Sequence, residues 1–200
     1  MILFLRLSLF IFLLIAPETV LAHSPIKGIG AFFNGILHPL LVPAQVLAIF
    51  SLGLWYGQNQ PTENKRSVIF YLIALIFGLV ATRFLPADND VSIILLLGAT
   101  IIGLLIISNY RLAKSAYRIV GLLFGFILGL DSVQDGLNLK ATLLALFGSG
   151  VGIYFLLLYF MALSESFSEK TWQNIAVRVL ASWISASALM VLALNFAGKG

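Results

Sequence analysis

One histidine, His38, interrupts the long apolar stretch near the start of the chain, within Ile36-Leu37-His38-Pro39-Leu40. A titratable side chain in such surroundings is costly unless it has a polar partner or a water-filled cavity. Three roles are open to it: metal ligand, proton relay or structural hydrogen bond. Asn34 lies one helical turn earlier and Gln45 two turns later, so both could share its neighbourhood.

A second group of polar residues follows the apolar run that ends at residue 130. Asp131 and Asp135 are one helical turn apart and could present two carboxylates together, with Gln134 between them. Oxygen ligands suit hard cations, and a mixed histidine and carboxylate site suits transition metals. The alternative interpretation is that these residues only end a helix at a solvated turn.

The first 22 residues have the pattern of a secretory signal peptide. Arg6 precedes a short apolar core over residues 7–16, and Val20-Leu21-Ala22 suits signal peptidase. An uncleaved first helix is the alternative, although the core is short for a membrane span. Cleavage leaves residues 23–200 as one mature domain that begins at His23. The α-amine and imidazole of such a residue can chelate a metal together, unless it is an ordinary solvated terminus.

Composition excludes several classes of protein. Hydrophobic residues make up 60% of the chain and charged residues only 10%, too few to cover the surface of a soluble domain. The basic residues stand singly at the ends of apolar runs, so the net charge of +4 indicates lipid-headgroup contact rather than nucleic-acid binding. Without cysteine there is no disulfide, thiolate metal site or cysteine nucleophile. No serine-hydrolase elbow, zinc-protease helix or phosphate-binding loop is present, so we do not expect an enzyme.

The apolar runs predict an all-α, polytopic transmembrane bundle with about six spanning helices. We expect the first run to be broken around His38–Pro43, because prolines 39 and 43 interrupt it. Irregular backbone at membrane depth is tolerated only where protein or a water-filled cavity surrounds it, so this break is a candidate site. The expected helices cover residues 28–37 and 44–56 (together one span), 67–85, 91–108, 117–130, 141–163 and 172–196.

Lysine and arginine set the expected orientation. With the mature N-terminus outside, seven of these residues fall in inner segments and four in outer segments, the bias that keeps positive charge in the cytoplasm. The C-terminus is then also outside. The inner residues are Lys65, Arg66, Arg111, Lys114, Arg118, Lys170 and Arg178; the outer ones are Lys27, Arg83, Lys140 and Lys199.

Glycines recur at every fourth position in two of the expected helices. Gly121, Gly125 and Gly129 form one row, and Gly148 and Gly152 form another. Such rows let the backbones of membrane helices approach closely. The first row could instead line a narrow path through the bundle.

The run from Gly30 to Leu40, with its Gly-x-x-x-x-Gly-x-x-His-Pro pattern, resembles the HupE/UreJ family of membrane proteins linked to nickel supply for hydrogenase and urease. The resemblance extends over nearly the whole chain, including an Ala-His leader end, the order of helices and Arg178-Val179-Leu180-Ala181. It implies a multi-pass protein of the bacterial plasma membrane.

The chain departs from that family's pattern at several expected ligands. Where the family has Gly-x-Asp-His after His-Pro, this chain has Val42-Pro43-Ala44-Gln45. In the family's fourth helix a glycine-containing motif carries two histidines and ends in an acidic residue. In this chain Phe124 and Leu128 replace the two histidines, whereas Asp131 keeps the final acid. Carried over residue by residue, His38 and Asp131 keep a metal-ligand type and Gln45 is a weak substitute.

The resemblance implies two functions that the sequence leaves open. One is a transporter that moves nickel or cobalt with a reduced ligand set. The other is a membrane accessory or structural subunit that keeps the fold without transporting and binds a membrane-protein partner.

Overall fold

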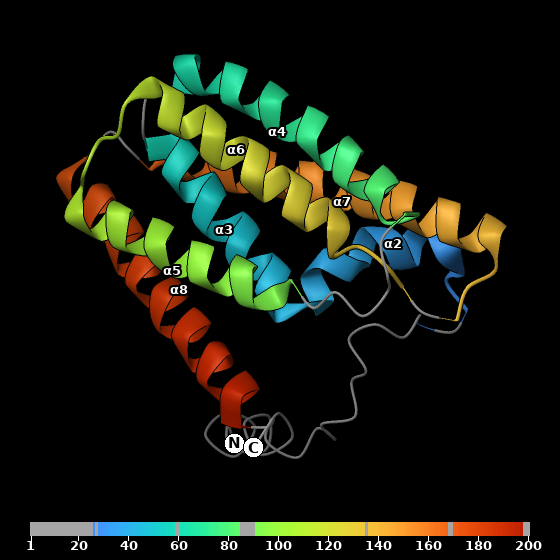
Figure 1. Ribbon diagram of the computed structural model, residues 1–200. Coiled ribbons are helices and arrows are strands. Elements are labelled where there is room, and N and C mark those ends of the chain that lie inside the picture. The colour runs from blue at the N-terminus through green and yellow to red at the C-terminus, as the bar shows by residue number, and fades with distance from the viewer. Residues whose placement is uncertain are drawn as a thin grey trace, which may run out of the picture.

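The computed structural model describes residues 26, 28–58, 61–84, 91–134, 136–167 and 170–197, with the side chains of 61–65 left aside (Figure 1). Over these residues all regular secondary structure is α-helical and there is no strand, which confirms the all-α prediction. The expected signal peptide lies outside the described residues. The helices are α2 (Gly30–Leu41), α3 (Pro43–Gln58), α4 (Pro61–Ala81), α5 (Ser92–Ser108), α6 (Lys114–Leu130), α7 (Leu139–Ser166) and α8 (Thr171–Ala197).

The first apolar stretch is broken at one residue, Val42, where α2 and α3 meet at a bend of 73°. The expectation of a break that begins at His38 was wrong, because His38 and Pro39 both lie within the last turns of α2. Val42 adopts an extended conformation, with φ −96° and ψ 109°. The following proline disfavours helical angles at Val42 and is itself well suited to begin a helix, so Pro43 sets the break.

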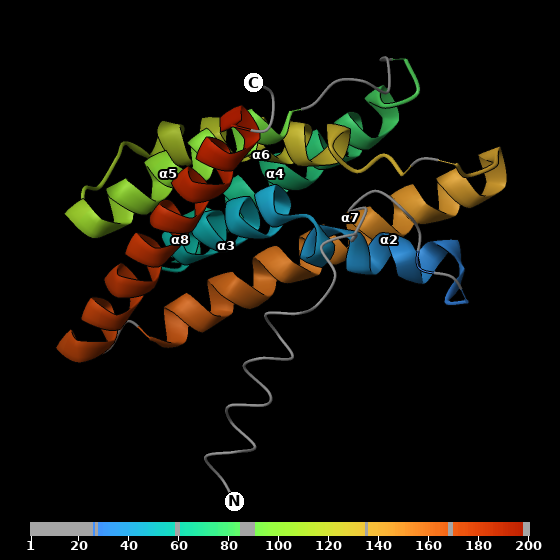
Figure 2. The same ribbon diagram turned by 90° about the horizontal axis from the view of Figure 1, so that it is seen from below.

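Helix α3 lies at the centre of the bundle and the other helices pack around it in pairs. Neighbours in space are α4 with α6, α2 with α7, and α5 with α8, while α3 contacts α5, α7 and α8 (Figures 1 and 2). Every residue from Ser51 to Gly57 is buried. This matches the sequence of α3, which is apolar around its whole circumference, as expected of a central helix.

Two helices, α7 and α8, are long and apolar enough to cross a membrane, and the bent α2–α3 pair makes a third if it counts as one span. The chain is therefore a helical membrane protein, and the expected total of six spans remains a prediction. Residues 66–81 and α5 are apolar but shorter. A 17-residue helix such as α5 is about 25 Å long, slightly less than a hydrocarbon core of about 30 Å.

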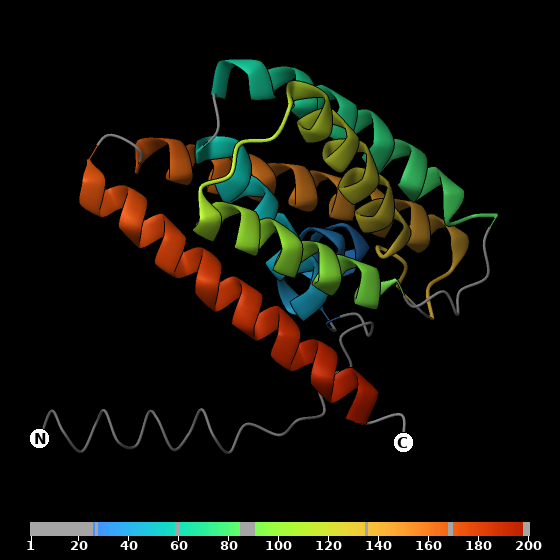
Figure 3. The ribbon, with the colours of Figure 1, turned by 60° about the vertical axis from the view of Figure 1, so that its left-hand side comes forward.

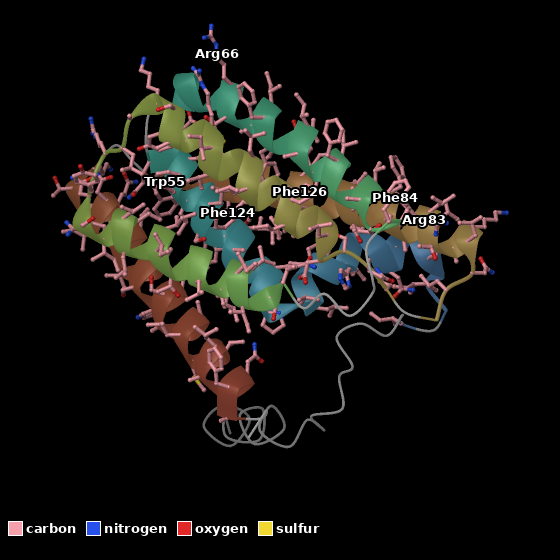
Figure 4. All side chains as sticks on the ribbon, viewed as in Figure 1. Trp55, Arg66, Arg83, Phe84, Phe124 and Phe126 are labelled. Atoms are coloured by element: carbon pink, nitrogen blue, oxygen red, sulfur yellow. The ribbon has the colours of Figure 1, made fainter. Side chains whose placement is uncertain are left out.

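The segments expected to face inward gather at one end of the structure. The end of α3, the start of α4, the turn between α5 and α6, the end of α7 and the start of α8 all lie there, and α8 then runs along the edge of the bundle beside α5 (Figures 1 and 3). Arg66 and Arg83, which the sequence assigns to opposite sides, stand at opposite ends of α4 (Figure 4). Helix α4 begins at Pro61, earlier than the predicted Ser67, because proline is favoured in a first helical turn.

Both glycine rows lie at helix contacts. A Cβ on Gly129 would be 2.6 Å from the backbone oxygen of Leu75 in α4, and Gly125 faces the Tyr71 backbone in the same helix. In α7, Gly152 faces the backbone of Ile36, at 2.5 Å from a Cβ to the carbonyl oxygen. The glycines thus let α6 touch α4 and α7 touch α2 through their backbones.

Candidate cation site at the helix break

Three polar side chains from separate parts of the chain meet beside the α2–α3 break. His38 Nε2 lies 3.3 Å from the backbone oxygen of Asp131, the residue that follows α6. Gln45, in the first turn of α3, donates from Nε2 to the same oxygen at 2.7 Å and to Asp131 Oδ2 at 2.9 Å. His38 and Gln45 are almost completely buried, at 2% and 0% exposure, and Asp131 is half-buried.

The end of α6 explains why these donors gather there. The last carbonyl groups of a helix lack donors from their own helix and carry a partial negative charge. The Asp131 N–H still bonds to the Ile127 carbonyl at 3.0 Å, but its own carbonyl accepts from the side chains that α2 and α3 supply. A carboxylate beside a helix C-terminus makes this corner electronegative, so it favours a hydrogen-bond donor or a cation.

Gln45 uses only one end of its amide. Its Nε2 serves both Asp131 oxygens, whereas its Oε1 is buried and has no hydrogen-bond partner among the described residues. A buried polar atom without a partner costs about 1–3 kcal/mol. The site therefore contains a buried amide oxygen without a hydrogen-bond partner in the described part of the chain, although Nε2 and not Oε1 faces Asp131.

Two of the remaining candidate residues, His23 and Asp135, lie outside the described residues. Asn34 and Gln134 are described but take no part in the contacts at the break. The side chain of Asn34 is fully engaged at the start of α2, where it accepts from Ile26 N–H at 2.6 Å and donates to the Ile26 and Gly30 carbonyls. Gln134 is 6% exposed, and neither amide atom has a hydrogen-bond partner in the described structure.

The donor set is poor in imidazole and carboxylate. No group of three or more histidine, cysteine, aspartate or glutamate side chains in the described part of the chain could hold a metal ion. Phe124 and Leu128 are buried at 8% and 0% exposure, so apolar side chains cover the face of α6 that is turned into the bundle. This arrangement suits a cation that binds weakly and leaves again more than one held permanently.

Sequence reasoning missed a buried aromatic cluster at the opposite end of α3. Tyr56 donates to the Tyr117 carbonyl at 2.8 Å, and the Trp55 ring stacks on the Tyr117 ring with centroids 4.2 Å apart (Trp55 is labelled in Figure 4). The Tyr71 side chain from α4 is fully buried and its hydroxyl has no hydrogen-bond partner among the described residues. These residues come from three helices, so no local sequence signal marks them as one group.

A family model described as HupE / UreJ protein matches residues 11–192 of the chain. The chain belongs to the HupE/UreJ family. The match includes every residue of the helix-break site, and it confirms the resemblance seen around His38 in the sequence. No curated protein and no solved structure matches the chain.

Proposed function

We propose that this HupE/UreJ protein moves a divalent metal cation, with nickel and cobalt as the family's expected cargo, across the membrane. The observation that carries the proposal is the meeting of His38, Gln45 and Asp131 at the α2–α3 break, with one buried oxygen unused. Transporters typically bind substrate where a membrane helix is discontinuous, because freed backbone groups and half-helix ends are available there. Polar residues at such a depth are expensive and hence are usually functional.

The proposal includes a topology. The signal peptide is removed after Ala22, residues 23–200 form one membrane domain, and both mature ends face outward. The α2–α3 pair is then the first span and α4 to α8 are the other five. Support comes from the basic residues, seven in the expected inner segments against four in the outer ones, and from the gathering of the inner segments at one end of the bundle (Figure 1).

The test is uptake of nickel and cobalt into proteoliposomes that contain the purified protein. His38→Ala should reduce uptake strongly, because the site has only one imidazole. His23→Ala removes the other imidazole, that of the second candidate ligand, and should leave uptake unchanged if the break is the binding site. Equal uptake by protein-free liposomes, the wild type and His38→Ala would refute transport of these metals.

A second function has its own supporting observation. The site holds one imidazole and one carboxylate. On the buried face of α6 the bulky apolar side chains of Phe124 and Leu128 stand in place of further ligands. A protein that kept the bundle but no longer transported would serve as a membrane accessory subunit. Purification in mild detergent would then recover a stoichiometric membrane-protein partner, whereas a solitary protein with uptake activity would exclude this function.

A further inference from the structure

We infer that the cargo of this chain is an oxygen-preferring divalent cation of the manganese class, and that Gln45 sets this preference. The inference rests on the proposed transport function and concerns the same site. It follows from which atoms are available at the break: one imidazole nitrogen, one carboxylate, one main-chain carbonyl and one amide oxygen. Oxygen atoms of these kinds suit manganese, magnesium and calcium, whereas imidazole suits nickel and its neighbours.

The distances between these groups already resemble those around a bound cation. Neighbouring ligands of an octahedral cation with metal–oxygen distances near 2.1 Å are about 3 Å apart. The Asp131 backbone oxygen lies 3.3 Å from His38 Nε2, and the Gln45 amide lies 2.7 and 2.9 Å from the two Asp131 oxygens. The three residues are therefore close enough together to share one ion, although two of these distances are measured to Gln45 Nε2, so its amide oxygen must first turn toward the site.

Gln45 can change from donor to ligand by turning over its amide. In the present structure Nε2 faces Asp131 and occupies the place of a cation's positive charge. Rotation about the last side-chain torsion, which has a broad and roughly two-fold profile, would bring Oε1 to the same place. Because Oε1 has no hydrogen-bond partner among the described residues, the rotation itself breaks only the two bonds from Gln45 to Asp131. Cation binding also displaces the bond between His38 Nε2 and the Asp131 carbonyl, and Nε2 binds the ion in the tautomer that carries the proton on Nδ1.

This geometry makes Gln45 a specificity-determining residue. An amide oxygen at this position adds a third oxygen donor, so His38 supplies the only nitrogen among the four donor atoms at the break. Nickel binds nitrogen and oxygen sites more tightly than manganese in general, but that advantage narrows when oxygen ligands replace imidazoles. A second imidazole at position 45 should therefore restore the advantage of nickel over manganese.

The experiment measures uptake of Mn²⁺ and Ni²⁺, alone and in competition, by full-length protein in proteoliposomes. The wild type should take up Mn²⁺, and equimolar Ni²⁺ should inhibit this only in part. Gln45→His should raise the preference for Ni²⁺ over Mn²⁺ on the order of tenfold or more, the size of effect seen when groups around a metal ligand change. Gln173→His adds an imidazole at the start of α8, far along the chain from the break, and should leave the preference unchanged.

Three outcomes would overturn the inference. Wild-type uptake of Ni²⁺ without Mn²⁺ would leave the transport function standing and exclude the manganese class. Uptake of neither metal would exclude the inference and the proposed transport of such cations together. Binding of Mn²⁺ to the purified wild type, measured as the loss of the free-ion electron paramagnetic resonance signal, tests whether the protein accepts this cation without any variant. Absence of binding at millimolar Mn²⁺ would contradict the inference.

Discussion

The contact between α4 and α6 should tolerate almost no added volume at Gly129. A Cβ there would lie 2.6 Å from Leu75 O, 2.7 Å from Leu79 N and 2.8 Å from Gly78 Cα. All three are main-chain atoms, so no side-chain rotation can relieve the overlap. To reach an ordinary contact of 3.4 Å they must retreat by about 0.6 to 0.8 Å, and over-packing of this kind costs about 1–3 kcal/mol.

Gly150→Ala is the matched control for Gly129→Ala. A Cβ on Gly150 would meet only Leu79 Cδ1, at 2.8 Å, and that methyl group is the mobile end of a side chain. Gly150 lies inside α7 and gains the full helix propensity of about 0.8–1 kcal/mol on substitution, whereas Gly129 lies in the last turn of α6 and gains no more than this, so propensity cannot make Gly129→Ala the more stable variant. Gly129→Ala should therefore be less stable than Gly150→Ala by about 1–3 kcal/mol.

The assay is unfolding in mixed micelles with a rising fraction of denaturing detergent, followed by far-ultraviolet circular dichroism. The free energy of unfolding of each variant is compared with that of the wild type. Equal stability of the two variants would refute the close backbone contact between α4 and α6. It would also reopen the interpretation in which the glycines of α6 line a path.

Three further predictions use single substitutions. Tyr56→Phe deletes the buried hydrogen bond to Tyr117 O and should lower the unfolding free energy by about 1 kcal/mol, whereas Tyr159→Phe at an exposed position should not; equal effects would count against the aromatic cluster. Ser164→Ala removes the 2.9 Å bond from α7 to Leu54 O in α3 and should cost about 0.6–1.7 kcal/mol in the same titration, more than Ser166→Ala, whose bond stays within its own turn. Because the chain has no cysteine, the single variants Lys140→Cys and Tyr110→Cys can each be labelled in right-side-out vesicles. A thiol reagent that does not cross the membrane should label position 140 and not position 110. Labelling at position 110 would overturn the proposed topology.

The positions of most helices could be predicted because apolar runs are separated by short polar turns. Helix α5 was expected over residues 91–108 and covers Ser92–Ser108. The start of α4 could not be predicted in this way, because residues 61–66 are polar and yet helical. Hydropathy indicates which residues face lipid, whereas the helix continues wherever backbone hydrogen bonds can form.

The candidate site could be predicted only residue by residue. His38, Gln45 and Asp131 each stood out by type, since each is a polar side chain in or beside an apolar run. Their meeting depends on the 73° bend at Val42 and on the end of α6 at Leu130. These two features are 88 positions apart in the sequence. Proline 43 signals a break, but neither its angle nor the neighbour it brings close can be derived from local sequence.

Electron spin-echo spectroscopy of bound Mn²⁺, on protein labelled with ¹⁵N only in histidine, tests most directly whether the helix break binds the cation. Only two histidines exist, so each can be assigned by removing the other. The account predicts coupling to one imidazole nitrogen that persists in His23→Ala and disappears in His38→Ala. Coupling that survives in His38→Ala would place the cation away from the break and contradict the account.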